Sequence, residues 1–182
     1  LSPFRKILYL NKAQKTITVE AGARWSDIDI VAKKEGLCLM TYPSSKFSTV
    51  AGWIATGGYG INSFRYGHVI QHIVSMTVVT PSGESRKITP TDPDFMYFVS
   101  TEGEFGIIVE VNLKLRDVPP ASYPHLFYFP GDDAAFEFIE KFVKSKDAEV
   151  IKPNVIRFLD ENHLNNINEL MHSQVFKKSA GV

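Results

Sequence analysis

Glycine, hydroxyl and aromatic residues gather in one stretch of the chain, TVAGWIATGGYGINSFRYG, which runs from Thr49 to Gly67. Glycine loses more backbone freedom on folding than any other residue, so this cluster indicates unusual dihedral angles or the close approach of a ligand. Two further segments, TYPSS (41–45) and STEGEFGII (100–108), have the same small, hydroxyl-rich character. Backbone amides of glycine-rich loops bind anions, and Ser and Thr hydroxyls add donors and acceptors. The three segments therefore predict a site for a large, flat cofactor that carries a pyrophosphate.

Other chemistries fit these residues poorly. GGYGINS (57–63) resembles the dinucleotide fingerprint G-x-G-x-x-G, but no clear strand precedes it and no good helix start follows. His68 and His72 have a spacing that could bind a metal on a helix, yet they lie where a strand is predicted and have no third ligand nearby. The sequence has no Walker A loop and no G-x-S-x-G elbow. We therefore predict no metal site and assign no catalytic residue.

The composition argues against recognition by bulk charge. Twenty acidic residues balance twenty basic ones, which excludes nucleic acid or an anionic membrane surface as the expected partner. The single cysteine, Cys38, is expected to be a small buried hydrophobe. The sequence shows no apolar run of membrane length and no signal peptide. We expect a cytoplasmic protein, or one that attaches to a membrane only at its periphery.

The elements that must position the three segments form an α+β domain. The apolar periods predict a strand pair within residues 6–22, a helix over 24–36 with Ser26 as its N-cap, a hairpin over 70–89 and a long strand over 106–118. Hairpins rather than βαβ crossovers indicate antiparallel pairing.

A second unit follows the break PPASYP. A helix over 132–144, between strands at 125–131 and 154–161, starts an α/β unit. We expect a first domain at 1–118, a linker at 119–124 and the beginning of a second domain at 125–182.

The order and spacing of these motifs resemble the PCMH-type FAD-binding domain of the vanillyl-alcohol oxidase/p-cresol methylhydroxylase flavoproteins. ITVEAGARWSDI, PSS, STVAGWIATGGYGINSFRYG, the VVTPSG hairpin and STEGEFGIIVEVNLKL occur in that order, over about residues 7–120. The resemblance is closest to the FAD-linked oxidase branch, which includes D-lactate dehydrogenases and the glycolate oxidase flavin subunit. It implies that residues 1–118 are the second subdomain, a mostly antiparallel sheet flanked by helices. Residues 125–182 would then begin the substrate-binding cap, and we expect the family's first subdomain, with its pyrophosphate loop, to lie outside the chain.

The resemblance also implies which residues bind FAD. The segment at 43–45 would pass beside the flavin and ribityl chain, and residues 49–60 would form a small-residue wall along the pyrophosphate and ring. Hydroxyls of Ser63 and Tyr66 would lie near the phosphate and flavin edge, and residues 103–108 beside the adenine and ribose. The full set is Pro43, Ser44, Ser45, Thr49, Gly52, Thr56, Gly58, Gly60, Ser63, Tyr66, Gly67, Gly103, Gly106, Ile107 and Ile108. For Gly58, Gly60 or both, we expect a positive φ or no room for a Cβ toward the pocket.

The implied function is oxidation of a small 2-hydroxy acid, such as D-lactate or glycolate, by hydride transfer to flavin N5. The electron acceptor stays open, and a homodimer or a partner subunit is an implied partner. We expect the chain alone to be inactive and to bind FAD weakly. Covalent flavin attachment through His68 is disfavoured because this position does not match the family's attachment site.

Two departures from the family pattern keep an alternative open. Ala51 replaces a glycine, and Gln71 stands where the family has an aspartate. A degenerate, non-catalytic domain of the same fold, acting as a binding or assembly subunit, would tolerate both changes. The retained glycines favour the enzyme.

Overall fold

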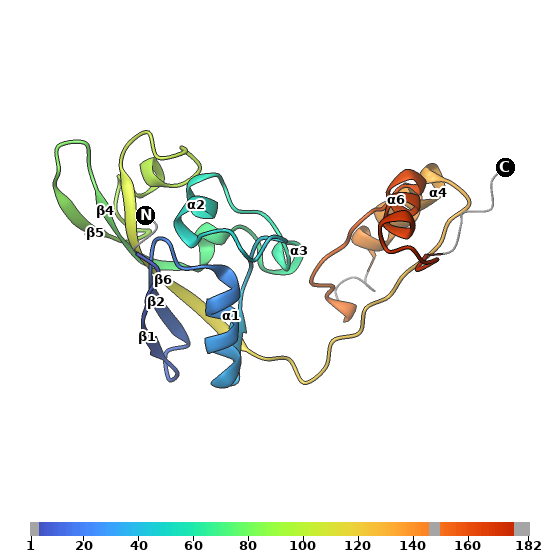
Figure 1. The fold of residues 1–182 in the computed structure, drawn as a ribbon, viewed down its shortest axis with the longest axis horizontal. Helices are drawn as coiled ribbons and strands as arrows, with labels where there is room; N and C mark the ends of the chain where they lie inside the picture. The colour runs from blue at the N-terminus through green and yellow to red at the C-terminus, as the bar shows by residue number, and fades with distance from the viewer. Residues whose placement is uncertain (1–3, 146–149, 177–182) are drawn as a thin grey trace. The chain divides into compact units, whose positions relative to one another are not determined.

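The computed structural model describes residues 4–145 and 150–176, and it divides the chain into two compact units, Leu1–Pro120 and Ala121–Val182 (Figure 1). This division falls inside the segment expected to be a linker. Among the described residues, no helix has the length and apolar character that a membrane span requires.

The first unit is built on a six-stranded antiparallel sheet in the order β1–β2–β6–β4–β5, with β3 paired to β6 beside this path. The strands are β1 (Ile7–Asn11), β2 (Thr16–Glu20), β3 (Leu37–Leu39), β4 (Ile73–Val79), β5 (Ser85–Ile88) and β6 (Ile107–Asp117). The predicted α+β class and antiparallel pairing are confirmed. The short β3 was not predicted, because three apolar residues give no period to detect.

Strand β6 is the centre of the sheet because it pairs along both edges. Ile17 of β2 and Ile73 of β4 both lie opposite Leu113. The alternating residues Val111, Leu113 and Leu115 are buried, and together with Ile17 they belong to one continuous apolar core. Burial of one face fixes the register, since a shift by one residue would turn these side chains outward.

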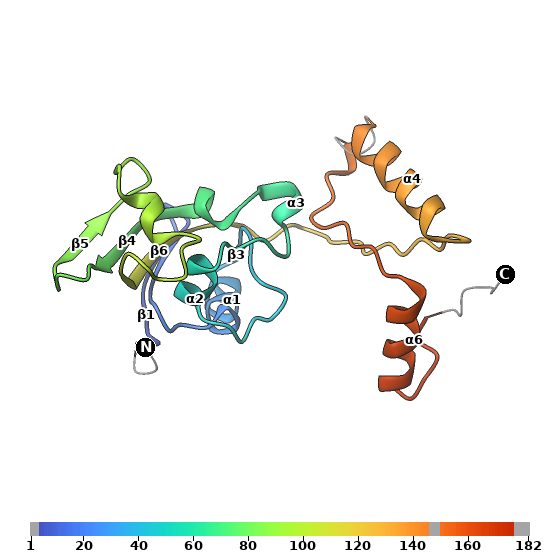
Figure 2. The ribbon, with the colours of Figure 1, turned by 90° about the horizontal axis from the view of Figure 1, so that it is seen from above.

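Helices α1 (Trp25–Lys34), α2 (Val50–Ala55) and α3 (Ser63–Tyr66) belong to the same unit, and α1 and α2 lie on one side of the sheet in both ribbon views (Figures 1 and 2). Helix α1 buries Trp25, Ile28 and Ala32, which recur at helical spacing. The prediction of Ser26 as its N-cap is wrong, because Arg24 holds that position and makes no side-chain cap.

The second unit contains helices α4 (Asp132–Lys144) and α6 (Glu161–Leu170). The helix predicted at 132–144 is found. The strands predicted at 125–131 and 154–161 are wrong, since neither segment has a strand assignment. Aromatic rings nevertheless join these segments to α4, with Phe136 packing on Phe158 at 4.6 Å and Phe129 on Phe138 at 5.1 Å between centroids. Apolar contacts alone do not form a β-sheet, because a strand also needs a neighbouring strand with which to exchange backbone hydrogen bonds.

Candidate cofactor-binding site

The first two predicted segments are joined by a β-bridge. Tyr42 and Ile61 exchange backbone hydrogen bonds, with N–O distances of 3.2 and 2.8 Å. The hydroxyl of Thr41 donates to the carbonyl of Ile61 over 3.0 Å and lies 2.7 Å from the Ser63 hydroxyl. The loop at 41–49 and the glycine-rich loop at 56–67 therefore form one surface.

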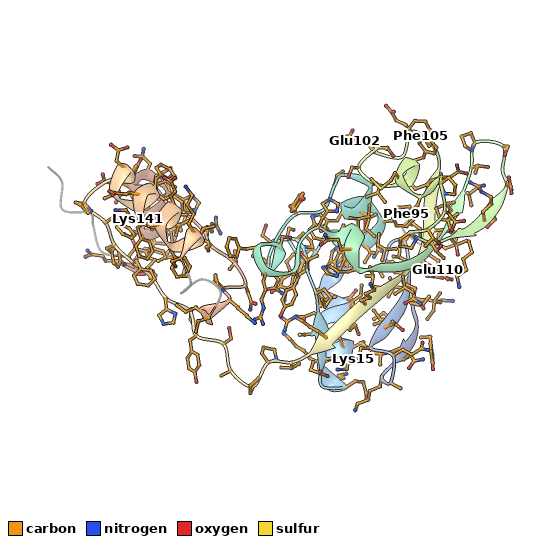
Figure 3. All side chains as sticks on the ribbon, turned by 180° about the vertical axis from the view of Figure 1, so that it is seen from behind. Lys15, Phe95, Glu102, Phe105, Glu110 and Lys141 are labelled. Atoms are coloured by element: carbon orange, nitrogen blue, oxygen red, sulfur yellow. The ribbon has the colours of Figure 1, made fainter. Side chains whose placement is uncertain are left out.

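The third segment closes the other end of helix α2. The amide of Ser100 donates to the carbonyl of Ile54 over 3.2 Å, and the amide of Glu102 donates to that of Ala55 over 2.9 Å. The last carbonyls of a helix have no partner within the helix, so these bonds satisfy them. Figure 3 labels Glu102 and Phe105 in this turn, at the end of the first unit that lies opposite Lys15. All three predicted segments thus surround one short helix.

The turn at 100–106 has an unusual backbone. Ser100 and Glu102 have φ values of 60° and 55°, and Gly103 and Gly106 have φ values of 89° and 151°. Positive φ costs a residue with a Cβ about 1–2 kcal/mol. Non-glycine residues in this region concentrate at binding and catalytic sites, so the turn is a candidate part of the site.

The N-terminus of helix α2 offers no free donors. The amides of Val50 and Ala51 donate to the carbonyls of Ala23 and Ala21, over 2.9 and 3.1 Å, and the Thr49 hydroxyl accepts from the amide of Gly52. A phosphate group therefore has nothing to accept from at this helix end. If Thr49 and Gly52 contact a cofactor, they do so through their exposed atoms rather than through these amides.

Free donors are found instead in the loop at 44–47. Within the described residues, the backbone amides of Ser44, Ser45, Lys46 and Phe47 have no hydrogen-bond acceptor, and the hydroxyls of Ser44 and Ser45 have no partner. Both serines and Phe47 are exposed, and Pro43 beside them is buried. Four consecutive unpaired amides can cradle an anionic group. This loop has the strongest donor chemistry among the predicted site residues.

The other predicted hydroxyls differ in availability. Ser63 accepts from the amide of Gly60 over 2.9 Å and also bonds Thr41, while Thr56 donates to the carbonyl of Gly52 over 3.0 Å. Ser63 and Thr56 therefore close turns. The Tyr66 ring packs against the guanidinium groups of Arg65 and Arg116, and its hydroxyl has no partner among the described residues.

Gly58 and Gly60 lack room for a Cβ, as expected, but not because of a pocket. An added Cβ on Gly60 would lie inside 3.0 Å of the Tyr42 carbonyl oxygen, and one on Gly58 would lie 2.8 Å from Val69. Neither residue has a positive φ. Packing within the protein explains both glycines, and their contact with a cofactor stays a prediction. Trp53 packs on the core and meets Trp25 edge-to-face at 5.1 Å.

The two histidines of the discarded metal hypothesis have structural partners. His68 Nδ1 accepts from the amide of Ile70 over 3.1 Å, and buried His72 lies with Nε2 2.8 Å from the carbonyl of Tyr66. Since a carbonyl can only accept, His72 Nε2 carries the proton. Burial lowers the pKa of His72, so the ring is neutral near pH 7. Within residues 4–145 and 150–176, no cluster of three or more His, Cys, Asp or Glu residues could hold a metal ion.

Cys38 is a buried residue of β3, and its thiol donates to the carbonyl of Asp117 over 3.4 Å. Burial raises the pKa of the Cys38 thiol, which makes it a poor nucleophile.

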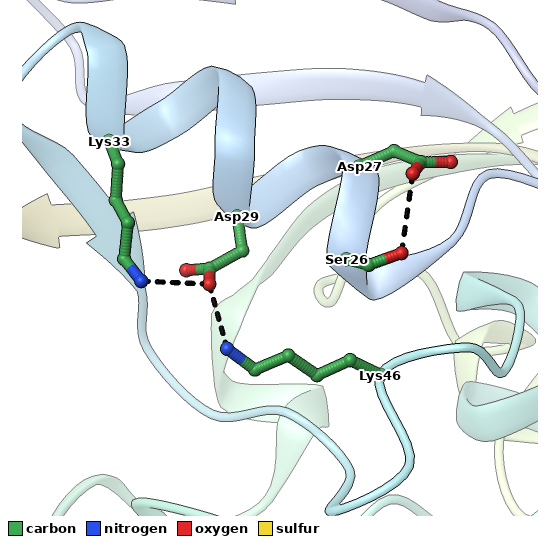
Figure 4. A network of polar contacts seen from close by, with 5 residues as sticks. All are labelled: Ser26, Asp27, Asp29, Lys33 and Lys46. Atoms are coloured by element: carbon green, nitrogen blue, oxygen red, sulfur yellow. Dashed lines mark hydrogen bonds and ion pairs between the residues drawn. The ribbon is translucent and has the colours of Figure 1, made fainter.

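Sequence reasoning missed one polar network beside the loop at 44–47. Asp29 of helix α1 accepts hydrogen bonds from Lys33 and from Lys46, which belongs to the loop (Figure 4). The only signal in the sequence is an acidic residue among the apolar positions of a helix, four residues before a lysine.

Known proteins resemble this chain in sequence and in fold. It is 25% identical to a D-lactate dehydrogenase of Anaerostipes hadrus over 98% of the chain and 38% of that relative. It is 30% identical to a D-2-hydroxyglutarate dehydrogenase of Xanthomonas citri pv. viticola over 78% of the chain and 32% of that relative. A solved alkyldihydroxyacetonephosphate synthase matches with a TM-score of 0.68 and 26% identity, over 82% of the chain and 28% of that structure.

The profile of the FAD binding domain matches residues 1–89, which include the loops at 41–49 and 56–67. Over these residues, just under half of the chain, the sequence matches the family of the FAD binding domain. FAD is therefore the cofactor of this domain, as predicted. The chain spans 38% of the length of the D-lactate dehydrogenase and 32% of that of the D-2-hydroxyglutarate dehydrogenase. It also matches a Dictyostelium discoideum alkyldihydroxyacetonephosphate synthase, with 31% identity, and spans 26% of the length of that protein.

The residues of the FAD-binding domain fit this cofactor. FAD presents a pyrophosphate that needs donors and a flat ring that needs apolar contacts. The four free amides at 44–47 supply donors, and the exposed rings of Phe47 and Tyr59 supply apolar surface within the same two loops. The assignment of individual residues to the flavin, ribityl or adenine parts of FAD stays a prediction. An open depression in the second unit, lined by Asn166, Glu169, Leu170 and His172, includes none of the predicted residues.

Proposed function

We propose that this chain is the flavin-binding part of an FAD-dependent oxidoreductase that oxidises a small 2-hydroxy acid. Two of the most similar relatives are named for D-2-hydroxy acids, D-lactate and D-2-hydroxyglutarate. When bound, FAD would accept a hydride from the carbon that carries the substrate hydroxyl. The single observation that carries the proposal is the loop at 44–47, whose free amides and hydroxyls stand beside the glycine-rich loop.

The protein's own residues would bind and orient the cofactor. Amides and hydroxyls at 44–47 would hold its polar groups, and the turn at 100–106 would present an exposed, left-handed backbone at the other end of helix α2. We assign no catalytic base to this chain.

The position of Ala51 supports the enzyme over a degenerate, non-catalytic domain. Ala51 is 4% exposed and belongs to the core, with its amide bonded to Ala21. Its methyl group therefore fills protein interior. The second departure from the family pattern, Gln71, has an exposed side chain that lies over Gly67. A Cβ added to Gly67 would overlap the Gln71 side chain.

A second candidate function comes from the synthase relatives. An alkyldihydroxyacetonephosphate synthase of Dictyostelium discoideum is 31% identical over 85% of the chain and 26% of its own length. Similar domains thus occur in proteins named for different activities, and the substrate of the present protein depends on residues outside this domain.

The test is a purification of the complete gene product followed by spectroscopy and a substrate screen. We expect flavin absorbance bands, and reduction of an artificial electron acceptor by one or more D-2-hydroxy acids. Formation of alkyldihydroxyacetonephosphate without hydroxy-acid oxidation would favour the second candidate. A colourless protein that stays colourless after incubation with FAD would refute both.

A further inference from the structure

Asp29 is a buried carboxylate that bonds two lysines from different elements. Only 8% of the residue is exposed, and its Oδ2 accepts from Lys33 Nζ over 2.9 Å and from Lys46 Nζ over 2.7 Å (Figure 4). Lys33 lies one turn further along helix α1, so that bond stays within the helix. Lys46 belongs to the loop at 41–49, so its bond joins the loop to the helix.

The loop is fixed to helix α1 by its backbone as well. The carbonyl of Lys46 accepts from the amide of Ser26 over 2.9 Å, and that of Ser48 accepts from the amide of Trp25 over 3.4 Å. The helix has no side-chain N-cap, so these carbonyls satisfy its first amides. The Lys46 ammonium also lies 4.5 Å from the centroid of the Tyr42 ring. Lys46 therefore contacts both the helix and the start of its own loop.

The charges make this arrangement specific. A buried carboxylate without a partner costs several kcal/mol, so Asp29 constrains where its lysines lie. Burial raises the pKa of Asp29, but the hydrogen bonds from Lys46 and Lys33 outweigh it and lower the pKa overall. The free amides at Ser44 and Ser45 directly precede Lys46, so the position of the Lys46 side chain bears on where those amides point.

We propose that Asp29 is a positioning residue, which acts through Lys46 to hold the loop at 44–47 in the conformation that presents its free amides and hydroxyls to FAD. This inference rests on the proposed function. In this proposal Asp29 acts through Lys46 and not by contact with FAD. Its effect reaches the site through one ion pair and two backbone bonds at the start of helix α1.

The test compares Lys46→Met with Lys33→Met in the complete gene product. Both variants remove one ammonium group from the same Asp29 oxygen and keep an apolar stem, but only Lys46→Met cuts the link to the loop. Hydrogen–deuterium exchange of the cofactor-free protein reports on the loop directly. We expect Lys46→Met to speed exchange at 44–48 about tenfold or more and to weaken FAD binding roughly tenfold, with little effect of Lys33→Met.

Further variants separate positioning from general stability. Asp29→Asn should reproduce the faster exchange and weaker FAD binding of Lys46→Met. The double variant Asp29→Asn/Lys46→Met should be no worse than either single variant. Lys46→Arg keeps the charge and should retain most of the FAD affinity. Equal effects of Lys33→Met and Lys46→Met would overturn the proposal, as would a loosened loop with unchanged FAD affinity. If the wild-type protein binds no FAD, the proposed function itself fails. This case is recognised because FAD titrations of the wild type and of every variant then show no binding.

Discussion

The amide of Glu102 donates to the carbonyl of Ala55 over 2.9 Å, and Glu102 makes this bond with a left-handed backbone, at φ 55°. An exposed, charged residue thus has a conformation that glycine adopts more easily, at the point where the turn at 100–106 meets helix α2.

Replacing Glu102 by glycine should therefore stabilise the protein. We expect Glu102→Gly to raise the free energy of unfolding by about 0.5–1 kcal/mol, because relief of the backbone strain exceeds the added entropy of the unfolded chain. Urea denaturation measures the change. Glu104→Gly is the matched control, since Glu104 is also exposed but has no positive φ, and it should destabilise. Destabilisation by both variants would show that Glu102 is not strained.

Gly60 should prove to be a structural glycine. From the sequence, Gly60 was a candidate for a residue without room for a Cβ toward the cofactor pocket. Because an added Cβ would overlap the Tyr42 carbonyl, we now expect even Gly60→Ala to cost about 1–3 kcal/mol of stability. Thermal unfolding of Gly60→Ala tests this against Gly131→Ala, where the added Cβ meets nothing within 4 Å. Equal melting temperatures for the two variants would contradict the packing assignment.

The predicted hydroxyls should separate into two classes. Ser44→Ala/Ser45→Ala removes hydroxyls without partners, so stability should change by less than about 0.5 kcal/mol while FAD affinity falls roughly tenfold. Ser63→Ala removes the acceptor of the Gly60 amide and should cost about 1–2 kcal/mol of stability. Chemical denaturation and flavin fluorescence titration measure the two quantities. Unchanged affinity in the double variant would exclude these hydroxyls from the site.

Stability should fall as acid protonates His72. Burial holds its folded-state pKa below the ordinary 6.5, so the unfolded chain binds more protons once the pH drops below that value. The contribution is complete above pH 6.5 and is lost as the pH falls toward the folded-state pKa. Lys114 and His68 face the ring and also disfavour its charged form.

Denaturation at a series of pH values between 5 and 8 checks this expectation. His72→Gln should flatten the slope over this window, at a cost in stability at neutral pH. His125→Gln, at an exposed position of the second unit, should leave the slope as in the wild type. A slope that survives His72→Gln would assign the pH dependence to other groups.

Much of the fold follows from local patterns. The strand pair, the helix after it, the hairpin and the strand at 106–118 have clear periods, and each is found. The N-cap of this helix was placed two residues late because Ser26 has the favoured cap chemistry, whereas the loop at 46–48 caps the helix through distant carbonyls. A cap supplied by another element leaves no local signal.

The segments of the candidate site could be selected from the sequence, but the contacts of their residues could not. Spacing of glycines and hydroxyls marked all three segments, and the structure gathers them around helix α2. The spacing of the glycines could not distinguish Gly60, which packs on Tyr42, from a residue that lines a cofactor. Asp29 and Lys46 are 17 residues apart, so their pairing depends on the tertiary fold alone.

The central place of β6 affects how this domain folds. Its residues come last in the first unit, yet they pair with β2 about ninety residues earlier, for example Leu113 with Ile17, and also with β3 and β4. The hairpins β1–β2 and β4–β5 can form early. They cannot join into one sheet until β6, which ends at Asp117, has left the ribosome. Pairing at such long range slows folding and prolongs the exposure of strand edges. We therefore expect the nascent domain to be most prone to aggregation before β6 is complete.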